Sequence, residues 1–285
     1  MGIFLDISGA FDNLALASAI AGLKTKGVAE NICKWYKFYL HNRKATASVA
    51  GCERSIVLKK GMPQGGVLSP VVWNMNFDGV LQLFDDSPVL ATLFADDLSL
   101  LISGTDLPTM MGIAQDAVDR TVDWGKKSGL AFSNIKTVVV LFSHKRANTE
   151  RARKLVMGGE QIPFSHSAKY LGILFDSRLN FREQVEQKCK KAIRLLMACR
   201  NALGRNWGLS VQKLKWMYDA IIRPMVCYGS IVWANRISPT NRFLMRVQRL
   251  ALLMMGSFLK STPTAGLEII FSIPPLHLHV RRKRR

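Results

Sequence analysis

The stretch TLFADDLSLLI, residues Thr92–Ile102, places two adjacent carboxylates between two apolar runs. This pattern predicts a buried β-hairpin with Asp96 and Asp97 at its tip. Like charges on an apolar platform repel each other and lose hydration, so a compensating charge is expected there. A divalent metal ion is the favoured compensator. The alternative is ordinary turn chemistry, because Asp is common in tight turns.

A third carboxylate, Asp6, ends another apolar segment, Ile3–Leu5. Neighbouring strands would bring it to Asp96 and Asp97, although about ninety residues separate them. Phosphoryl transfer commonly uses two metal ions roughly 3.5–4 Å apart, and hard divalent ions prefer carboxylate ligands. Asp6 alone would also suit a helix N-cap. Asp12 is favoured as an exposed first-turn acid that interacts with a helix dipole.

Strands and helices mix in the first 176 residues, and helical patterns dominate afterwards. This order predicts an α+β domain followed by an all-helical subdomain. Strands are expected at residues 2–7, 45–58, 137–142 and 170–175, with a small hairpin at 155–162. Helices are expected at residues 12–26, 30–39, 69–84, 108–128, 181–203, 211–222 and 241–255.

Positive charge is concentrated in the second half. Residues 1–143 carry 13 Lys and Arg against 13 Asp and Glu, whereas residues 144–285 carry 27 against 7. The whole net charge of +20 therefore lies in residues 144–285, which favours a polyanionic partner such as nucleic acid. Candidate phosphate contacts on two predicted helices include Lys188, Lys191, Arg246 and Arg249.

Aromatic residues in the same half are expected to be core residues rather than base-stacking platforms, because most have apolar neighbours. They are Trp207, Trp216, Tyr218, Tyr228 and Trp233.

The five cysteines are scattered and form no C-x-x-C pair, so the sequence supports neither a zinc site nor a disulfide framework. A reducing, intracellular compartment fits this usage. The sequence contains no run of 18 apolar residues and no signal peptide pattern, so no membrane association is expected. The basic run 281–285 suits either a nuclear localisation patch or a solvated helix end.

Three segments occur in a telling order: FLDISGAFDNL (Phe4–Leu14), GMPQGGVLSP (Gly61–Pro70) and LFADD (Leu93–Asp97). Together they resemble motifs A, B and C of the reverse transcriptase palm. GLAFSNIKT (Gly129–Thr137) resembles the next palm motif, and KYLGILFDSRLNF (Lys169–Phe181) the segment after it. MYDAIIRPMVCYGSIVWA (Met217–Ala234) is similar to the region after the palm in insect-type non-LTR retrotransposons.

The resemblance implies a polymerase palm over residues 1–176, with an antiparallel sheet and packed helices. It also implies that most of the N-terminal fingers are lacking and that residues 177–285 form a basic, thumb-like helical region.

The resemblance further implies two Mg²⁺ ions, with Mn²⁺ as an alternative. Asp6 and Asp96 match the family's metal-binding acids, and Asp97 matches their less direct neighbour. The backbone carbonyl of Ile7 is an additional expected ligand. Lys136 matches a lysine proposed to protonate the leaving pyrophosphate; its alternative is a solvated surface role.

Other positions match the substrate contacts of the family. Phe11 corresponds to a steric gate that disfavours a ribose 2′-hydroxyl, its alternative being a core Phe. Gln64 and Gly65 correspond to the loop near the incoming nucleotide, or else form a Gly/Pro turn. Leu171 and Gly172 correspond to a hairpin that holds the primer end, or else belong to a buried strand.

The implied function is RNA-directed DNA polymerisation: transfer of dNMP from a dNTP to a DNA primer on an RNA template, with a nuclear location by resemblance. Whether this chain is active alone is left open, and the sequence indicates no protein partner. Two alternatives remain, a non-catalytic nucleic-acid-binding remnant and a group II intron maturase-like protein.

Overall fold

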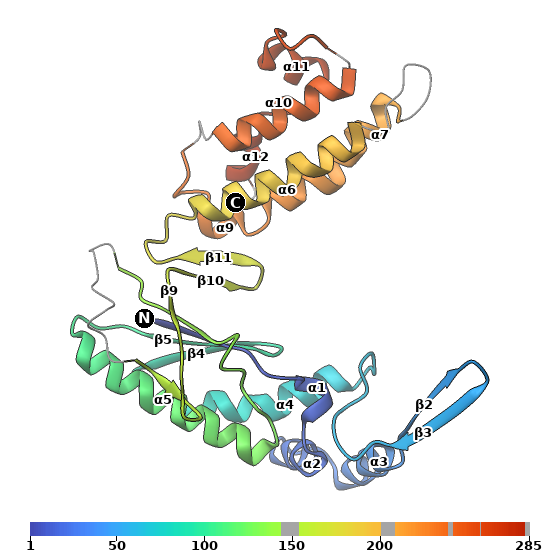
Figure 1. The fold of residues 1–285 in the computed structure, drawn as a ribbon, viewed down its shortest axis with the longest axis vertical. Helices are drawn as coiled ribbons and strands as arrows, with labels where there is room; N and C mark the ends of the chain where they lie inside the picture. The colour runs from blue at the N-terminus through green and yellow to red at the C-terminus, as the bar shows by residue number, and fades with distance from the viewer. Residues whose placement is uncertain (144–153, 201–208, 239–241, 257, 283–285) are drawn as a thin grey trace. The chain divides into compact units, whose positions relative to one another are not determined.

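The computed structural model describes residues 1–143, 154–200, 209–238, 242–256 and 258–282 (Figure 1). The chain divides into two compact units, unit 1 (Met1–Ala168) and unit 2 (Lys169–Arg285). Each unit has its own cluster of buried apolar side chains. The two units meet between Ala168 and Lys169, near the start of a hairpin that ends at Asp176. The sequence predicted the boundary after residue 176, at the end of that hairpin.

Unit 1 is built on a five-stranded sheet in the order β4-β5-β1-β6-β9. The central strand β1 pairs antiparallel with β5 on one side and β6 on the other, and β6 pairs parallel with β9. The strands are β1 (Gly2–Leu5), β4 (Val89–Phe94), β5 (Asp97–Ile102), β6 (Val138–Val140) and β9 (Phe164–Ser165). Ile3, Leu98 and Val139 are fully buried, which fixes the register because a one-residue slip would expose them.

In unit 1, α4 contacts β4 and α5 contacts β5, while α2 packs on α4 and α3 packs on α2 (Figure 1). The helices of unit 1 are α1 (Ala10–Asn13), α2 (Leu16–Thr25), α3 (Glu30–His41), α4 (Ser69–Leu81), its 3₁₀ continuation η1 (Gln82–Phe84) and α5 (Leu107–Ser128). The Asp106 carboxylate caps α5 by accepting the Thr109 amide, and Gly129 ends it with a φ of 76°.

Two small ribbons complete unit 1. Strands β2 (Lys44–Val49) and β3 (Cys52–Val57) form an antiparallel hairpin in which every residue is exposed. Strands β7 (Val156–Met157) and β8 (Glu160–Gln161) form the short hairpin that the sequence predicted.

Unit 2 contains the two-stranded sheet of β10 (Ser167–Tyr170, which begins just before the division) and β11 (Ile173–Asp176), followed by helices. The prediction of one strand over residues 170–175 was wrong. Leu171 and Gly172 have φ values of 48° and 76°, so they reverse the chain as a two-residue hairpin turn.

The helices of unit 2 include one continuous run in which a π-helical turn joins two α-helices. They are α6 (Arg182–Arg200), α7 (Val211–Met217), the π-helix η3 (Tyr218–Ile222), α8 (Arg223–Cys227), α9 (Ser230–Trp233), α10 (Arg242–Gly256), α11 (Thr264–Ile270) and α12 (Leu276–Arg282). None of the helices in the described ranges is long and apolar enough to cross a bilayer.

The aromatic residues of unit 2 divide into two groups. Tyr218 and Trp233 are each 1% exposed, which confirms their prediction as core residues. Trp216 and Tyr228 are 63% and 49% exposed, so the same prediction was wrong for them. Apolar neighbours in sequence fix neither the helix face that Trp216 occupies on α7 nor the side of the turn after α8 on which Tyr228 lies. Trp207 lies outside the described residues.

Candidate active site

Three carboxylates lie at one end of the unit 1 sheet. Leu5 of β1 pairs with Leu98 of β5, so the next residue, Asp6, and the preceding one, Asp97, lie at the same strand ends. Asp96 occupies the adjoining two-residue turn between β4 and β5. Burial raises the pKa of Asp97, and the negative charges of Asp96 and Asp6 raise it further. The structure therefore brings the three predicted acids together.

Asp6 forms an ion pair with Lys136, with 3.1 Å between its Oδ2 and the lysine Nζ. The same Oδ2 is buried and has no partner that meets hydrogen-bond geometry. The surrounding backbone is fixed, because the Asp6 carbonyl accepts the Ser133 amide at 2.8 Å and its amide faces the Thr137 hydroxyl at 3.5 Å. Asp6 is thus held rigidly while one carboxylate oxygen keeps capacity for a cation.

Ile7, the predicted backbone ligand, is buried and forms an isolated β-bridge with Phe132. This bridge extends the order of β1 past Asp6. In the described part of the chain, no three His, Cys, Asp or Glu side chains are arranged as a metal cluster. The donor chemistry nevertheless fits a hard divalent cation, because burial and the neighbouring carboxylates raise the pKa of Asp97 and the buried Oδ2 of Asp6 already faces one cation, the Lys136 ammonium.

The turn that carries Asp96 is fastened by Trp73 of α4. The indole Nε1 donates to the Ala95 carbonyl at 2.8 Å, and Ala95 has a φ of 56°, unusual for a residue with a side chain. Trp73 is 1% exposed. Sequence reasoning missed it; the available signal was a Trp within a predicted packed helix, since a buried indole N–H needs an acceptor.

Phe11, the predicted steric gate, stacks on Trp73 with 5.1 Å between ring centroids and 24° between planes. The ring is partly buried. Phe11 therefore packs on the same indole that holds the acidic turn.

Gln64 and Gly65 lie in the loop before α4. The Gln64 amide donates to both carboxylate oxygens of Asp12, at 3.0 and 3.2 Å, which ties the loop to α1. Asp12 is exposed in the first turn of α1, as predicted. Gly65 has a φ of 81°, and no heavy atom lies within 4 Å of the position a Cβ would take. The backbone at Gly65 therefore borders open space.

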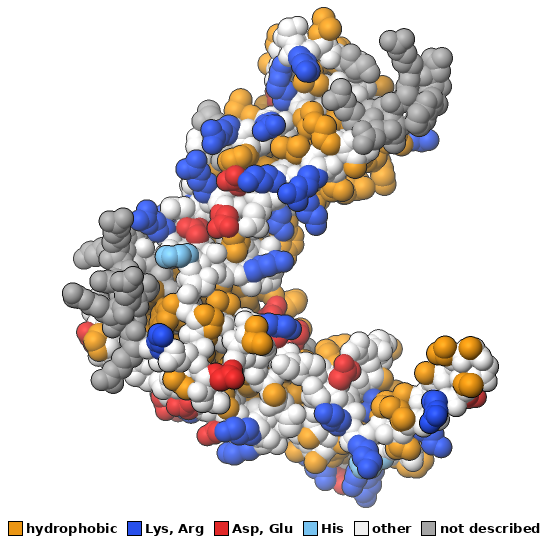
Figure 2. Space-filling view, viewed as in Figure 1, with side chains coloured by type: hydrophobic (Ala, Val, Ile, Leu, Met, Phe, Trp, Pro, Cys, Tyr) orange, Lys and Arg blue, Asp and Glu red, His pale blue; other side chains and the backbone are white. Residues whose placement is uncertain are grey.

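In unit 2, the predicted primer-contact residues Leu171 and Gly172 form the turn between β10 and β11. Lys188 and Lys191 lie on α6, and the Lys188 ammonium is 5.1 Å from the centre of the Tyr228 ring. Burial lowers the pKa of Lys188, and the positive charges of Lys169 and Lys191 lower it further. In Figure 2, many Lys and Arg side chains gather over the helices of unit 2.

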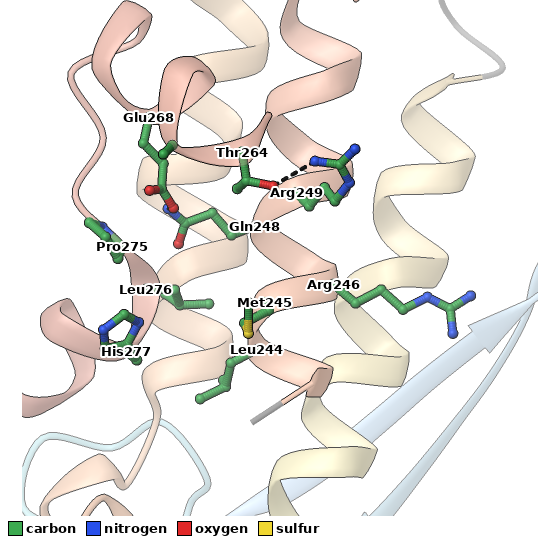
Figure 3. Close-up of a pocket in the computed structure, with 11 residues that line it drawn as sticks. Leu244, Met245, Arg246, Gln248, Arg249, Thr264, Glu268, Pro275, Leu276 and His277 are labelled. Atoms are coloured by element: carbon green, nitrogen blue, oxygen red, sulfur yellow. Dashed lines mark hydrogen bonds between the residues drawn. The ribbon is translucent and has the colours of Figure 1, made fainter. Parts of the chain in front are cut away.

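The two predicted arginines of α10 differ in their surroundings. The Arg249 guanidinium donates to the Thr262 carbonyl at 3.0 Å and the Thr264 hydroxyl at 2.6 Å, so it holds the connection between α10 and α11 (Figure 3). Arg246 is exposed, and its side chain extends away from Glu268 and His277 (Figure 3).

A pocket of about 400 Å³ lies beside these arginines, between α10, α11 and the start of α12. Burial raises the pKa of Glu268, which the positive charge of nearby His277 partly offsets. Glu268 also accepts a 2.8 Å hydrogen bond from buried Gln248. Gln248 also donates to the Pro274 carbonyl at 3.1 Å, so it links α10 to α11 and to the segment before α12.

Comparison with known proteins identifies the family to which this chain is similar. The family described as reverse transcriptase (RNA-dependent DNA polymerase) matches residues 1–175. A 115 kDa protein of the type-1 retrotransposable element R1DM from Drosophila melanogaster is 28% identical over 98% of this chain and 27% of its own length. The RNA-directed DNA polymerase from mobile element jockey of Drosophila funebris is 25% identical over 81% of this chain and 25% of its own length.

A telomerase from Candida albicans aligns in structure over 98% of this chain and 50% of its own, with a TM-score of 0.47 and 11% identity. The chain spans about a quarter of the length of the two retroelement proteins. Because the family match covers more than half of its 285 residues, this chain belongs to the reverse transcriptase (RNA-dependent DNA polymerase) family.

Proposed function

We propose that this chain carries the nucleotidyltransferase site of an RNA-directed DNA polymerase of a non-LTR retrotransposon. The reaction transfers dNMP from a dNTP to the 3′-hydroxyl of a DNA primer, directed by an RNA template. The observation that supports this proposal is the meeting of Asp6, Asp96 and Asp97 at one sheet end. Two Mg²⁺ ions, or Mn²⁺, would be held there by these carboxylates and the Ile7 carbonyl.

When bound, such ions supply a lowered pKa for the attacking hydroxyl and charge neutralisation at the leaving pyrophosphate. The residues of the chain supply position and protons. Asp6 and Asp97 hold their carboxylates on rigid strand ends, and Trp73 fixes the turn that carries Asp96. Lys136, now paired with Asp6, is proposed as the proton donor to the pyrophosphate, a role worth roughly 10²–10⁴-fold in rate.

Nucleotide selection is assigned to the surface beside this turn. Phe11, whose ring stacks on Trp73, is proposed to exclude a ribose 2′-hydroxyl. Gln64 and Gly65 are proposed to contact the incoming nucleotide, where the open space at Gly65 allows the backbone to approach a ligand. Replacement of Phe11 by Val should therefore raise incorporation of ribonucleotides relative to deoxynucleotides.

Contacts to the template–primer duplex are assigned to unit 2. Leu171 and Gly172 are proposed to face the primer end. Lys188, Lys191, Arg246 and Arg249 are proposed to contact phosphates, and Arg249 would have to share donors that now bind the connection between α10 and α11.

The test is primer extension by the full chain on an RNA template, comparing wild type with Asp96→Asn. Loss of incorporation by at least 10³-fold is expected, because the altered side chain is a proposed metal ligand. Asp86→Asn is the matched control: Asp85 and Asp86 form another exposed acidic pair, at the opposite end of β4. Unchanged incorporation by Asp96→Asn would refute the assignment.

A second candidate function is nucleic-acid binding without catalysis. The ion pair between Lys136 and Asp6 favours it, because Asp6 is already neutralised without a metal. This function predicts binding that weakens steeply with salt, no incorporation, and no effect of Asp96→Asn on affinity. Template-dependent incorporation by the wild type would reject it.

A further inference from the structure

Tyr228, which follows α8, is joined directly to the hairpin turn of unit 2. Its hydroxyl donates to the Leu171 carbonyl at 2.8 Å. Its ring lies against Gly172, since a Cβ built on that glycine would be 3.1 Å from the ring carbon Cε1. One side chain thus contacts both residues that reverse the chain between β10 and β11.

This turn needs external support. Leu171 has a φ of 48°, a conformation that a residue with a Cβ adopts only at a cost in free energy. A side-chain donor aimed at the carbonyl of the strained residue restricts its rotation. Gly172 leaves room for the aromatic ring on the other side of the turn, where a larger residue would be strained by the φ of 76° and would press on Tyr228.

Tyr228 is itself anchored to the core of unit 2. The indole of Trp233, which is 1% exposed, donates to the Tyr228 carbonyl at 3.0 Å. The next residue, Gly229, has a φ of 68°, and a Cβ there would lie 2.5 Å from the Ile173 side chain. The dipeptide Tyr228-Gly229 therefore fits closely against the hairpin, while the Tyr228 ring remains 49% exposed.

One lysine faces the exposed ring, and two more lie close enough to that lysine to act on its charge. The Lys188 ammonium is 5.1 Å from the ring centre, a cation–π distance. Lys169 on β10 and Lys191 on α6 act electrostatically on Lys188. Within the described residues, none of the three forms an ion pair with a carboxylate. Three crowded, unneutralised cations beside a fixed aromatic ring are suited to bind an anion.

We propose that Tyr228 is a positioning residue that fixes the Leu171–Gly172 turn and that, with Lys169, Lys188 and Lys191, it builds a phosphodiester-binding subsite beside that turn. The ligand class is the backbone of a nucleic-acid duplex. The inference rests on the proposed function, which assigns this turn to the primer end. The hydrogen bond from Tyr228 to the Leu171 carbonyl and the Tyr228 ring fix the shape of the turn, and the three lysines supply positive charge for the phosphodiester.

The first experiment measures amide hydrogen exchange in Ser167–Asp176 of the full chain. Tyr228→Phe removes the hydroxyl but keeps the ring, so exchange at the turn should become about twofold faster, as the loss of one solvent-exposed hydrogen bond allows. Tyr39→Phe is the matched control, because Tyr39 is a similarly exposed tyrosine, 41%, in unit 1. Unchanged exchange in Tyr228→Phe would overturn the positioning role.

The second experiment measures binding of a labelled 20-base-pair RNA–DNA hybrid between 50 and 200 mM salt. Lys188→Gln should lower the slope of log affinity against log salt by about one. Tyr228→Leu, once its helical circular dichroism matches wild type, should weaken binding without changing that slope. Lys213→Gln, at an exposed lysine of α7, is the control. An unchanged slope in Lys188→Gln would overturn the subsite.

Primer extension then separates this inference from the proposed function. Tyr228→Phe should raise the KM for primer–template and leave kcat for nucleotide addition unchanged, a split that general loss of folding does not produce. A wild-type chain that extends no primer would refute the polymerase proposal, while exchange and hybrid binding would still decide on the subsite. Extension that depends on Asp96 but shows an unchanged KM in Tyr228→Phe would refute the subsite alone.

Discussion

Two hairpin turns of this chain share a design. The turn Ala95–Asp96 joins β4 to β5 in unit 1, and Leu171–Gly172 joins β10 to β11 in unit 2. Each begins with a residue that has a Cβ and a positive φ, 56° at Ala95 and 48° at Leu171. In each, the carbonyl of that residue accepts a 2.8 Å hydrogen bond from an aromatic side chain.

The two aromatic donors differ in burial. Trp73 is 1% exposed and stacks on both Phe11 and Phe77, whereas Tyr228 is 49% exposed. A buried donor that loses its acceptor pays the desolvation penalty, whereas an exposed hydroxyl finds water instead. The exposed turn with the acids is therefore anchored to a buried core residue, whereas the turn of unit 2 is held by a solvent-exposed hydrogen bond.

Trp73→Ala should have the largest effect. The substitution removes a buried indole together with its stacking contacts to Phe11 and Phe77. It should therefore lower the free energy of unfolding of unit 1 by about 3–5 kcal/mol. Urea unfolding followed by circular dichroism measures this change. Trp216→Ala, which removes an indole that is 63% exposed in unit 2, should stay within about 0.5 kcal/mol. Equal losses in the two variants would contradict the stabilising role assigned to the buried indole beneath the acidic turn.

Trp73→Phe isolates the hydrogen bond, because an aromatic ring remains between Phe11 and Phe77. We expect a loss of roughly 1–2 kcal/mol in the same unfolding measurement. Tyr228→Phe breaks a hydrogen bond of the same length in unit 2 but should cost less than about 0.5 kcal/mol, because water can donate to the Leu171 carbonyl in place of the lost hydroxyl. A larger loss for Tyr228→Phe would reverse the proposed order of the two turns.

Addition of Mg²⁺ should stabilise unit 1 alone. At about ten times its dissociation constant, an ion that binds only the folded state adds about 1.4 kcal/mol. Thermal unfolding with and without Mg²⁺ measures the gain, and Asp6→Asn should abolish it. Slower hydrogen exchange at Leu171–Gly172 on adding Mg²⁺ alone would contradict the assignment of the metal to the turn of unit 1.

Asp97→Asn should have the smallest effect, and it should be stabilising. Burial and the charges of Asp96 and Asp6 raise the pKa of Asp97, so the ionised carboxylate destabilises the folded state at neutral pH. Without metal, the variant should gain a few tenths of a kcal/mol at pH 7. The gain should disappear as the pH falls below about 4, where the wild-type carboxyl is protonated in both states. Urea unfolding at pH 7 and pH 3.5 tests this, and a loss of stability at pH 7 would contradict it.

Sequence patterns located the acids because apolar runs on both sides of Asp96 and Asp97 determine a strand and its end. Long periodic helices such as Leu107–Ser128 were likewise predictable, since a capping Asp and a terminal Gly mark their limits. Short helices such as Ser230–Trp233 were missed, because four residues carry no measurable periodicity.

The side-chain hydrogen bonds that hold the two turns were not predictable from the sequence. Trp73 reaches a carbonyl 22 residues away, and Tyr228 one 57 residues away, so neither contact leaves a local pattern. The resemblance indicated a hairpin at Leu171 and Gly172, but the residue pattern predicted one strand over 170–175, because the turn lacks the Asn-Gly or Asp-Gly pair typical of such turns. Long-range hydrogen bonds, rather than local preference, stabilise that conformation.

The order of strands in unit 1 has a consequence for how the protein is made. Strand β1 lies in the middle of the sheet, yet its partners are residues 98–101 and 138–140. On the ribosome, Gly2–Leu5 is made before both neighbours and stays without them until synthesis has passed residue 140. During that interval an apolar segment stays unpaired, which makes nascent unit 1 a natural client for chaperones.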